Sequence, residues 1–523
     1  MSNTVQRVGD LSPAEKRALL ADHLRIRARQ SASSHPLSYN QHGIWFLCQL
    51  APESSVYTVN FAARIRAELD VPALKHAFQT LVDRHAALRT TFPVQRGKPI
   101  QRVHGAREVH FQEVEASGWS SEELETRVLD EAYRRFDLER GPLLRVALFT
   151  RSAREHILLL VVHHIVIDFW SLAILLDEIG VLYPAEKTGA QVILPPLTLR
   201  YTDYVRWQAE LLASPEGDRL WAYWQQQLAG QLPVLELRTD RPRPAIPTYR
   251  GASHDFAMSA ELSSGFKALA RTHGATLYTA LLATFQILLS HHTGQEDLLV
   301  GSPMAGRSRA GFEGIVGLFT NPVVLRANLS GNPTFREFLD QVRHTVLSAL
   351  EHQDYPAVLL VERLRPPRDL SRPPLCQVMF VLDKPHRIAE QGAPALTAAE
   401  TGLRMNPGGL VLESMPLERR AATLDLVLLI IETQDSLNAS MRYNTDLFDV
   451  ATIARMSRHF DILLRRILDE PTARLDALKR ALARADRQQQ ATVRTKQKEA
   501  NIQKMTHLRR KILLASPPGR EAP

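Results

Sequence analysis

The chain has 523 residues, of which 45% are hydrophobic, so it is long enough to form more than one buried core. Its apolar runs, such as 157–162, are only strand-sized, which excludes a membrane-spanning helix, and the charges throughout 1–29 exclude a secretory signal. We therefore expect a soluble, cytoplasmic protein that inserts no segment into a membrane.

The net charge of +8 is concentrated at one end of the chain. Residues 474–523 contain thirteen Lys and Arg against four Asp and Glu, which leaves the rest of the chain near neutrality. This tail has no aromatic residue to stack on bases, so nucleic-acid binding is not expected. Cys48 and Cys376 are too few for a disulfide framework or a thiolate metal site, and we expect both to be small core residues.

Residues 1–35 are expected to form a helical leader, because 11–29 has a helical pattern and Ser12, before Pro13, supplies a start signal. An α/β half is then predicted over 36–230. Its expected elements are a helix over 71–85, an alternating segment over 103–114, two strands within 145–162 and helices within 204–228.

A proline-rich crossover is predicted over 231–250, where four prolines interrupt any regular element. A second α/β half, 251–470, repeats the mixture of the first. Its expected elements are helices over 265–292, 334–352 and 448–468 and strands over 297–302, 376–382 and 424–432.

The segment 471–523 is predicted to be a basic helical linker or docking tail. Its helical pattern runs to about residue 512 without a broad apolar face, which is typical of a solvated helix. Removal of 474–523 is therefore expected to leave the fold intact and to weaken the docking of partners. Met1 and the short end after Ile512 suggest a discrete protein, whereas the basic tail resembles a linker between domains.

The densest chemical signal is the run 156–171, which reads HILLLVVHHIVIDFWS. A strand-sized apolar block ends in His163 and His164, and the helical pattern of 170–183 follows. Successive strand residues point to opposite faces, so one histidine is expected to be catalytic and the other structural. An adjacent pair does not converge on one ion, and no other cluster has ligand spacing, so no metal is expected.

Two interpretations of this run stay open on its residues alone. Both histidines can be satisfied core residues, with Asp168 capping the following helix. The alternative comes from resemblance, because HHIVIDFWS resembles the HHxxxDG core motif of condensation domains, a branch of the chloramphenicol-acetyltransferase-like acyltransferases. Phe169 stands where that motif has glycine, and it should narrow the space beside His164 or turn into the core.

Further stretches resemble motifs of the same family, in the family's order, across most of the chain after Pro36. They are LSYNQHGIWFL (37–47), RHAALRTTF (84–92), YTDYVRW (201–207), IVGLFTNPVVLR (315–326), HQDYP (352–356), RDLSRPPL (368–375) and YNTDLFD (443–449). Taken singly, most of these are ordinary turns and helix ends. Their joint presence and order carry the resemblance.

The resemblance implies an α/β fold of two chloramphenicol-acetyltransferase-like halves, set as a V-shaped pseudodimer around a central tunnel. It implies a catalytic group of His164, His163 and Asp168, with His164 as the base. Asp168 is also expected to form a structural ion pair with Arg307. Phe169, Trp170 and Ser171 are expected along the substrate tunnel; backbone amides near Trp170 and Ser171 either stabilise an oxyanion or belong to a plain helix cap.

The implied activity is condensation of a carrier-bound acyl, polyketidyl or peptidyl thioester with an acceptor nucleophile, giving an amide or an ester in nonribosomal peptide or hybrid polyketide–peptide biosynthesis. No bound cofactor is expected, since phosphopantetheine belongs to the partner carriers. The expected partners are donor and acceptor carrier proteins and other assembly-line subunits, and the chain itself is expected to be a monomer.

Rival interpretations concern neighbouring families and one different class. The chain has no EGHGRE-like stretch of an epimerisation domain, no aspartates in place of the histidine pair as in a heterocyclisation domain, and no DFGWG of a coenzyme A acyltransferase. The rival from a different class is a catalytically silent platform that keeps the fold and only docks carriers or tailoring enzymes. The sequence leaves the donor and the acceptor unidentified.

Overall fold

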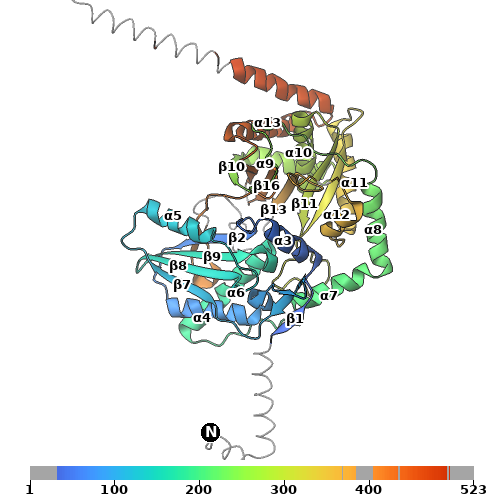
Figure 1. Ribbon diagram of the computed structural model, residues 1–523. Coiled ribbons are helices and arrows are strands. Elements are labelled where there is room, and N and C mark those ends of the chain that lie inside the picture. Colours follow the sequence, from blue (N-terminus) through green and yellow to red (C-terminus); the bar gives the residue numbers. More distant parts are fainter. Residues whose placement is uncertain are drawn as a thin grey trace, which may run out of the picture.

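The computed structural model describes residues 32–367, 369–383, 404–433, 436–491, 494 and 504. Two six-stranded sheets, each covered by helices, form a lower and an upper half in the view of Figure 1. The expected α/β class with two similar halves is therefore confirmed. The leader helix expected over 11–29, the last part of the basic tail and Arg368 of the RDLSRPPL stretch lie outside the described residues.

The first half is built around the sheet order β14-β15-β2-β9-β8-β7, with a small β1-β6-β3 sheet and the β4-β5 hairpin beside it. Its elements are β1 (Ser33–His35), α3 (Tyr39–Leu50), β2 (Thr58–Ile65), α4 (Val71–Arg84), η1 (Ala86–Arg89), β3 (Thr90–Thr91), β4 (Val94–Gln95), β5 (Lys98–Pro99), β6 (Gln101–Val103), β7 (His110–Glu115), α5 (Ser121–Ala132), β8 (Leu144–Ser152), β9 (Glu155–His163), η2 (His164–Val166), α6 (Phe169–Thr188), α7 (Tyr201–Leu212) and α8 (Pro215–Gln227).

Strand β9 is an uninterrupted apolar run because both faces of its sheet are covered. Leu158, Leu160 and Val162 point to the core beneath helices α4 and α6. The alternate residues, Ile157, Leu159 and Val161, point to the core beneath helix α5 on the opposite face. Burial on both sides fixes the register of β9 and so the position of the two histidines at its end.

The second half has the sheet order β10-β17-β16-β13-β11-β12. Its elements are β10 (Gly251–Met258), α9 (Ala260–Thr272), α10 (Leu277–Thr293), β11 (Asp297–Met304), β12 (Asn321–Asn328), α11 (Phe335–Glu351), α12 (Ala357–Leu364), β13 (Val378–Asp383), β14 (Arg404–Met405), η5 (Pro407–Gly409), β15 (Leu412–Ser414), β16 (Leu426–Glu432), β17 (Leu437–Asn444) and α13 (Val450–Asp469).

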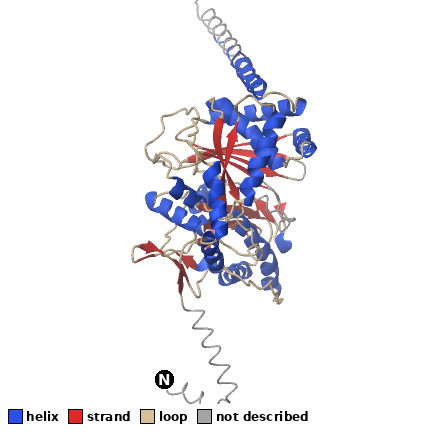
Figure 2. Ribbon diagram, turned by 90° about the vertical axis from the view of Figure 1, so that its right-hand side faces the viewer, coloured by secondary structure: helices blue, strands red, loops and turns tan. Residues whose placement is uncertain are grey.

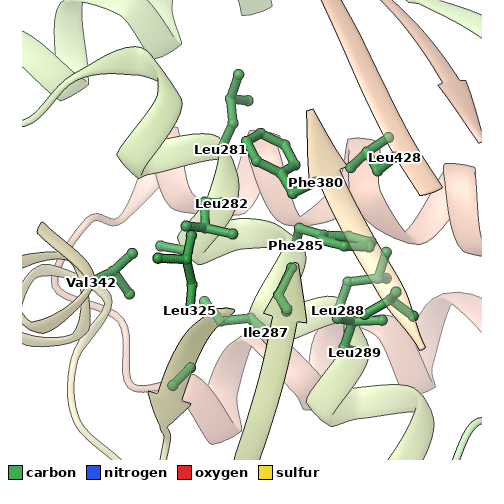
Figure 3. Close-up of a cluster of buried hydrophobic side chains, with 14 of the residues drawn as sticks. Leu281, Leu282, Phe285, Ile287, Leu288, Leu289, Leu325, Val342, Phe380 and Leu428 are labelled. Carbon is green, nitrogen blue, oxygen red and sulfur yellow. The ribbon is translucent and has the colours of Figure 1, made fainter. Parts of the chain in front are cut away.

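Helix α10 is the centre of the second core. Its residues 279–290 are buried all round, as expected for a helix that is apolar on every side. Figure 3 shows Phe285 of this helix near Phe380 of β13, and Leu282 near Leu325 of β12. The single helix expected over 265–292 was wrong, because α9 ends at Thr272 and Thr276 caps a new helix through a bond from the Thr279 amide.

Several elements pack outside the half to which their sequence position assigned them. Helix α8 buries Leu220 and Trp224 in the core of the second half, although the first half was expected to extend to 230. In the opposite sense, β15 pairs with β2 and completes the first sheet. Strand β1, expected in the helical leader, pairs with β6. Figure 1 shows helix α8 alongside the upper half, next to α11 and α12, and Figure 2 shows the two groups of strands and helices one above the other.

The segment expected to be a solvated tail begins inside the second core. Residues 475–491 are helical, and Leu475, Leu478 and Leu482 are almost fully buried there with Ile467 of helix α13. The three leucines follow one another at spacings of three and four, a narrow stripe that the surrounding charged residues hide in the sequence. The boundary expected at 470 therefore cuts through the core.

A close backbone crossing fixes the returning strands against the first half. Gly408 of η5 has φ +56°, and a Cβ there would lie 1.5 Å from the carbonyl oxygen of Gly180 in helix α6. Only glycine fits such an approach. The crossing carries β14 and β15 to the edge of the first sheet.

Candidate active site

The histidine pair lies at the point where β9 ends and helix α6 has not yet begun. Strand β9 ends at His163, and His164 starts the short η2 turn. The strand does not continue to His164 as expected, yet the two rings still serve different environments, because His163 is buried and His164 is half-buried.

The geometry of His164 leaves one ring nitrogen for chemistry. Its Nδ1 lies 2.6 Å from the carbonyl oxygen of Ile167, which accepts hydrogen bonds only, so Nδ1 carries the proton. In the neutral ring Nε2 then has a free lone pair. The backbone amide of His164 donates to the Tyr57 carbonyl oxygen at 2.7 Å, which anchors the turn to the first sheet. His164 is thus oriented as a proton acceptor.

His163 has a structural environment. Its Nδ1 accepts a hydrogen bond from the Ile165 amide at 3.1 Å, and its Nε2 lies 3.7 Å from Cys48 Sγ. The Phe136 ring packs edge-on at a centroid distance of 5.7 Å. Burial, with the neighbouring His164 adding to it, lowers the pKa of His163 to about 3, so the ring is neutral. These contacts favour a supporting role for His163 over a place in the chemistry.

Asp168 and Arg307 come together across the two halves, as the family resemblance implied. Arg307 Nη2 lies 3.2 Å from Asp168 Oδ1, and the two side chains are 2% and 0% exposed. Asp168 also accepts hydrogen bonds from the amides of Ser171 at 2.8 Å and Phe319 at 3.0 Å. Arg307 donates to the Phe312 and Ile315 carbonyl oxygens and lies over the Phe319 ring. The pair therefore ties the segment that contains His164 and Asp168 to the second half.

Gly306 makes this pairing possible. It has φ +66°, and a Cβ there would lie 2.0 Å from the Phe319 carbonyl oxygen. The backbone of 306 and that of 319 approach too closely for any side chain. This close approach places Arg307 within reach of the Asp168 carboxylate.

Ser171 belongs to the same buried hydrogen-bond network as Asp168 and Arg307, and not to an oxyanion site. Its amide donates to Asp168, its Oγ lies 2.6 Å from Asp168 Oδ1, and the same Oγ accepts from Arg307 at 2.8 Å and from the Gly317 amide at 3.1 Å. Of the two interpretations left open for Ser171, the helix cap is the one its contacts favour, because its amide is already used.

Phe169 and Trp170 occupy the surface side of the helix start. Phe169 is 45% exposed, and its ring lies 6.4 Å from that of His164, so it narrows the space there and does not turn into the core. Trp170 Nε1 donates to the Glu313 carbonyl oxygen at 2.9 Å, which adds a further tie between the halves.

Residues that sequence reasoning left without a role also hold the loop. Gln41 Nε2 donates to the Ile165 carbonyl oxygen at 3.0 Å, and the Ser38 hydroxyl bonds that of Tyr201 at 2.9 Å. Tyr201 donates in turn to the Leu318 carbonyl oxygen, next to Phe319. All three lie in stretches that resemble family motifs, but nothing in a linear pattern says that a Gln on one helix supports a turn more than a hundred residues away.

Among the described residues, no helix is both long and apolar enough to cross a membrane.

Comparison with known families gives a match over most of the chain. A family model described as "Condensation domain" matches residues 31–490. Chondramide synthase cmdD of Chondromyces crocatus is 36% identical over 457 residues, which is 87% of this chain and 11% of that protein. Phosphinothricin tripeptide synthetase PhsC of Streptomyces viridochromogenes is 32% identical over 500 residues, 91% of this chain and 44% of that one. The chain thus spans only a minor part of these curated relatives.

Solved structures agree with this match. The X-domain from teicoplanin biosynthesis has a TM-score of 0.75 and 30% identity, covering 84% of this chain and 96% of that domain. The condensation domain of the monacolin K polyketide synthase MokA has a TM-score of 0.73 at 20% identity, covering 85% and 99% of the two chains. At that identity the second likeness concerns the fold alone.

Proposed function

The chain belongs to the condensation-domain family, and from this premise we propose that it transfers an acyl group from a carrier-bound thioester to an acceptor nucleophile. The observation that carries the proposal is the oriented His164, whose Nδ1 is held by the Ile167 carbonyl oxygen so that Nε2 can accept a proton. The donor would be an acyl, polyketidyl or peptidyl thioester, and the acceptor an amine or an alcohol. The phosphopantetheine arms would belong to the two partner carriers, entering a tunnel between the halves.

In the proposed step the acceptor nitrogen attacks the thioester carbonyl carbon and a tetrahedral oxyanion forms. The acceptor proton passes to His164 Nε2, the carbon–sulfur bond breaks, and the thiolate leaves with a proton, so that an amide and a carrier thiol result. General-base assistance of this kind is typically worth ~10²–10⁴-fold. Alignment of two carrier-bound substrates would contribute alongside it.

Phe169 is the residue on which we expect acceptor or donor preference to depend. It replaces the glycine of the core motif, and its exposed ring stands beside that of His164. We expect Phe169→Gly to change the relative rates of small and bulky substrates while the unfolding midpoint moves little. Equal effects on every substrate would argue against a steric role.

A silent platform of the same fold remains the second candidate, because one observation favours it. The X-domain that this chain resembles is also known in a complex with OxyB, at 28% identity and a TM-score of 0.74. A chain of this fold can therefore bind a protein such as OxyB in addition to carrier proteins. The oriented His164 favours catalysis over this alternative.

The deciding experiment is intact-mass analysis of acyl transfer from a loaded donor carrier to free and carrier-bound amines and alcohols. We expect condensed product with the wild type and a fall of ~10²–10⁴-fold with His164→Gln. His76→Gln, an exposed histidine on helix α4, is the matched control and should retain activity. Absence of product with every pair, while both carriers still bind, would move the assignment to the platform.

A further inference from the structure

Three histidines and an aspartate cluster at the end of the second half that carries the C-terminal helix. His291 and His292 end helix α10, His459 lies in helix α13, and Asp486 lies in the helix over 475–491. In Figure 1, helices α10 and α13 lie together at the top of the molecule, beside the start of this last helix. The cluster is built on the second half, whereas His164 stands at the end of β9 in the first.

We propose that His291, His459 and Asp486 bind a divalent transition-metal ion of the zinc class. Each offers one ligand atom, and these atoms lie within 4.8 Å of one another. Two imidazoles and one carboxylate form a donor set typical of zinc, with the fourth tetrahedral position left for water. Sequence spacing gave no sign of this set, because its members come from three separate helices.

The hydrogen bonds already present match those of a metal site. His459 Nε2 lies 2.9 Å from Asp486 Oδ1, and His459 Nδ1 lies 3.1 Å from His292 Nε2. An ion bound to His459 Nε2 would replace the proton shared with Asp486. Nδ1–H would then donate to His292, which is the outer-shell bond that metal-bound histidines normally make.

Charged side chains near the cluster act on the site in opposite senses. Arg455 and Lys479 carry positive charges that act on His291 and oppose the binding of a cation, whereas the Asp486 carboxylate attracts one.

Coordination requires small shifts of the ligand atoms, which now lie within 4.8 Å of one another, with His459 Nε2 and Asp486 Oδ1 only 2.9 Å apart. Bond lengths of ~2.0–2.1 Å place tetrahedral ligands roughly 3.4 Å apart. His459 is 2% exposed and fixed by its neighbours, whereas His291 is half-buried at a helix end and can rotate. The bound ion would then link the helix over 475–491 to α10 and α13. This helix contains residue 490, at which the match to the family model ends.

The test is Co²⁺ titration of the full-length, tag-free protein after chelator treatment, followed by visible absorption. We expect tetrahedral bands that saturate at one equivalent and are displaced by Zn²⁺. His291→Ala and Asp486→Asn should each weaken binding by at least about tenfold, since loss of an outer-shell partner alone costs ~10–100-fold. Arg455→Gln should tighten it, because it removes a repelling charge.

Controls separate this site from other histidines and from misfolding. His344→Ala, at an exposed position on helix α11, and His164→Ala should bind Co²⁺ as the wild type does. Hydrogen exchange over 475–491 should slow on adding Zn²⁺ to the wild type but not to Asp486→Asn, with circular dichroism unchanged. Absence of tetrahedral bands, or equal binding by wild type, His291→Ala and Asp486→Asn, would overturn the proposal.

Discussion

Removal of the Asp168 carboxylate tests how strongly the two halves are joined beneath the His164 loop. At 3.2 Å and an effective dielectric constant of about 20, the attraction to Arg307 is roughly 5 kcal/mol, most of it offset by desolvation. In Asp168→Asn, a side-chain NH₂ replaces an acceptor in a site that contains the donors Ser171 N–H, Phe319 N–H and Arg307. The buried guanidinium also loses its counter-charge.

We therefore expect Asp168→Asn to destabilise the fold by ~3–5 kcal/mol, as for other broken buried pairs. The assay is chemical unfolding followed by two probes, one in each half, since such a chain need not unfold in one step. Asp297→Asn is the matched control, because its pair with Arg326 is partly exposed and should be worth ~1 kcal/mol or less.

A second arm separates the charge from the packing. Asp168→Leu combined with Arg307→Met replaces the ion pair by apolar groups and should cost less than the sum of the single changes. If Asp168→Asn cost no more than Asp297→Asn, the pair would not be the joint that the buried geometry indicates.

Three further outcomes follow from particular contacts. Truncation after residue 491 should leave the unfolding midpoint unchanged. Truncation after 473, which the sequence predicted to leave the fold intact, should lower the midpoint sharply, because it removes three buried leucines worth ~2–5 kcal/mol each. Equal midpoints for the two truncations would refute this. Burial and, to a smaller extent, the charge of Glu178 raise the pKa of Asp177 from 3.8 to about 6. The free energy of unfolding should therefore fall as pH rises from about 3.8 to about 6. Asp177→Asn should therefore stabilise the protein at pH 7, by ~1 kcal/mol after allowance for partial exposure, and not at pH 3, as a pair of urea titrations would reveal. Gly306→Ala, where a Cβ would meet the Phe319 carbonyl oxygen, should displace Arg307 and reduce activity and stability together, while Gly331→Ala, also at positive φ but in open space, reports the cost of the dihedral alone.

The strand and helix pattern around the histidines was predictable because local burial dictates it. An apolar run covered on both faces has no alternation, and the end of that run marks the end of β9 whatever lies elsewhere in the chain. The pairing of Asp168 with Arg307 was suggested by the family resemblance and not by spacing.

What the sequence did not reveal depends on contacts between distant segments. Helix α8 has the pattern of any amphipathic helix, and nothing local tells which core its Leu220 and Trp224 enter. The same holds for β15, a three-residue strand whose partner β2 lies far away in the chain. The stripe of Leu475, Leu478 and Leu482 was missed for a different reason, because flanking arginines and lysines made the segment look solvated.

The hydrogen bond between His164 Nδ1 and the Ile167 carbonyl oxygen means that His164→Ala removes two things at once. It deletes the proton acceptor and leaves a loop carbonyl without its donor, so a loss of activity alone does not identify a base. His164→Asn separates them, because an asparagine NH₂ can still donate to Ile167 but offers no basic nitrogen. If His164 is the base, Ala and Asn should both lose ~10²–10⁴-fold in turnover. If it only holds the loop, Asn should retain most of the activity and the pH profile of the wild type.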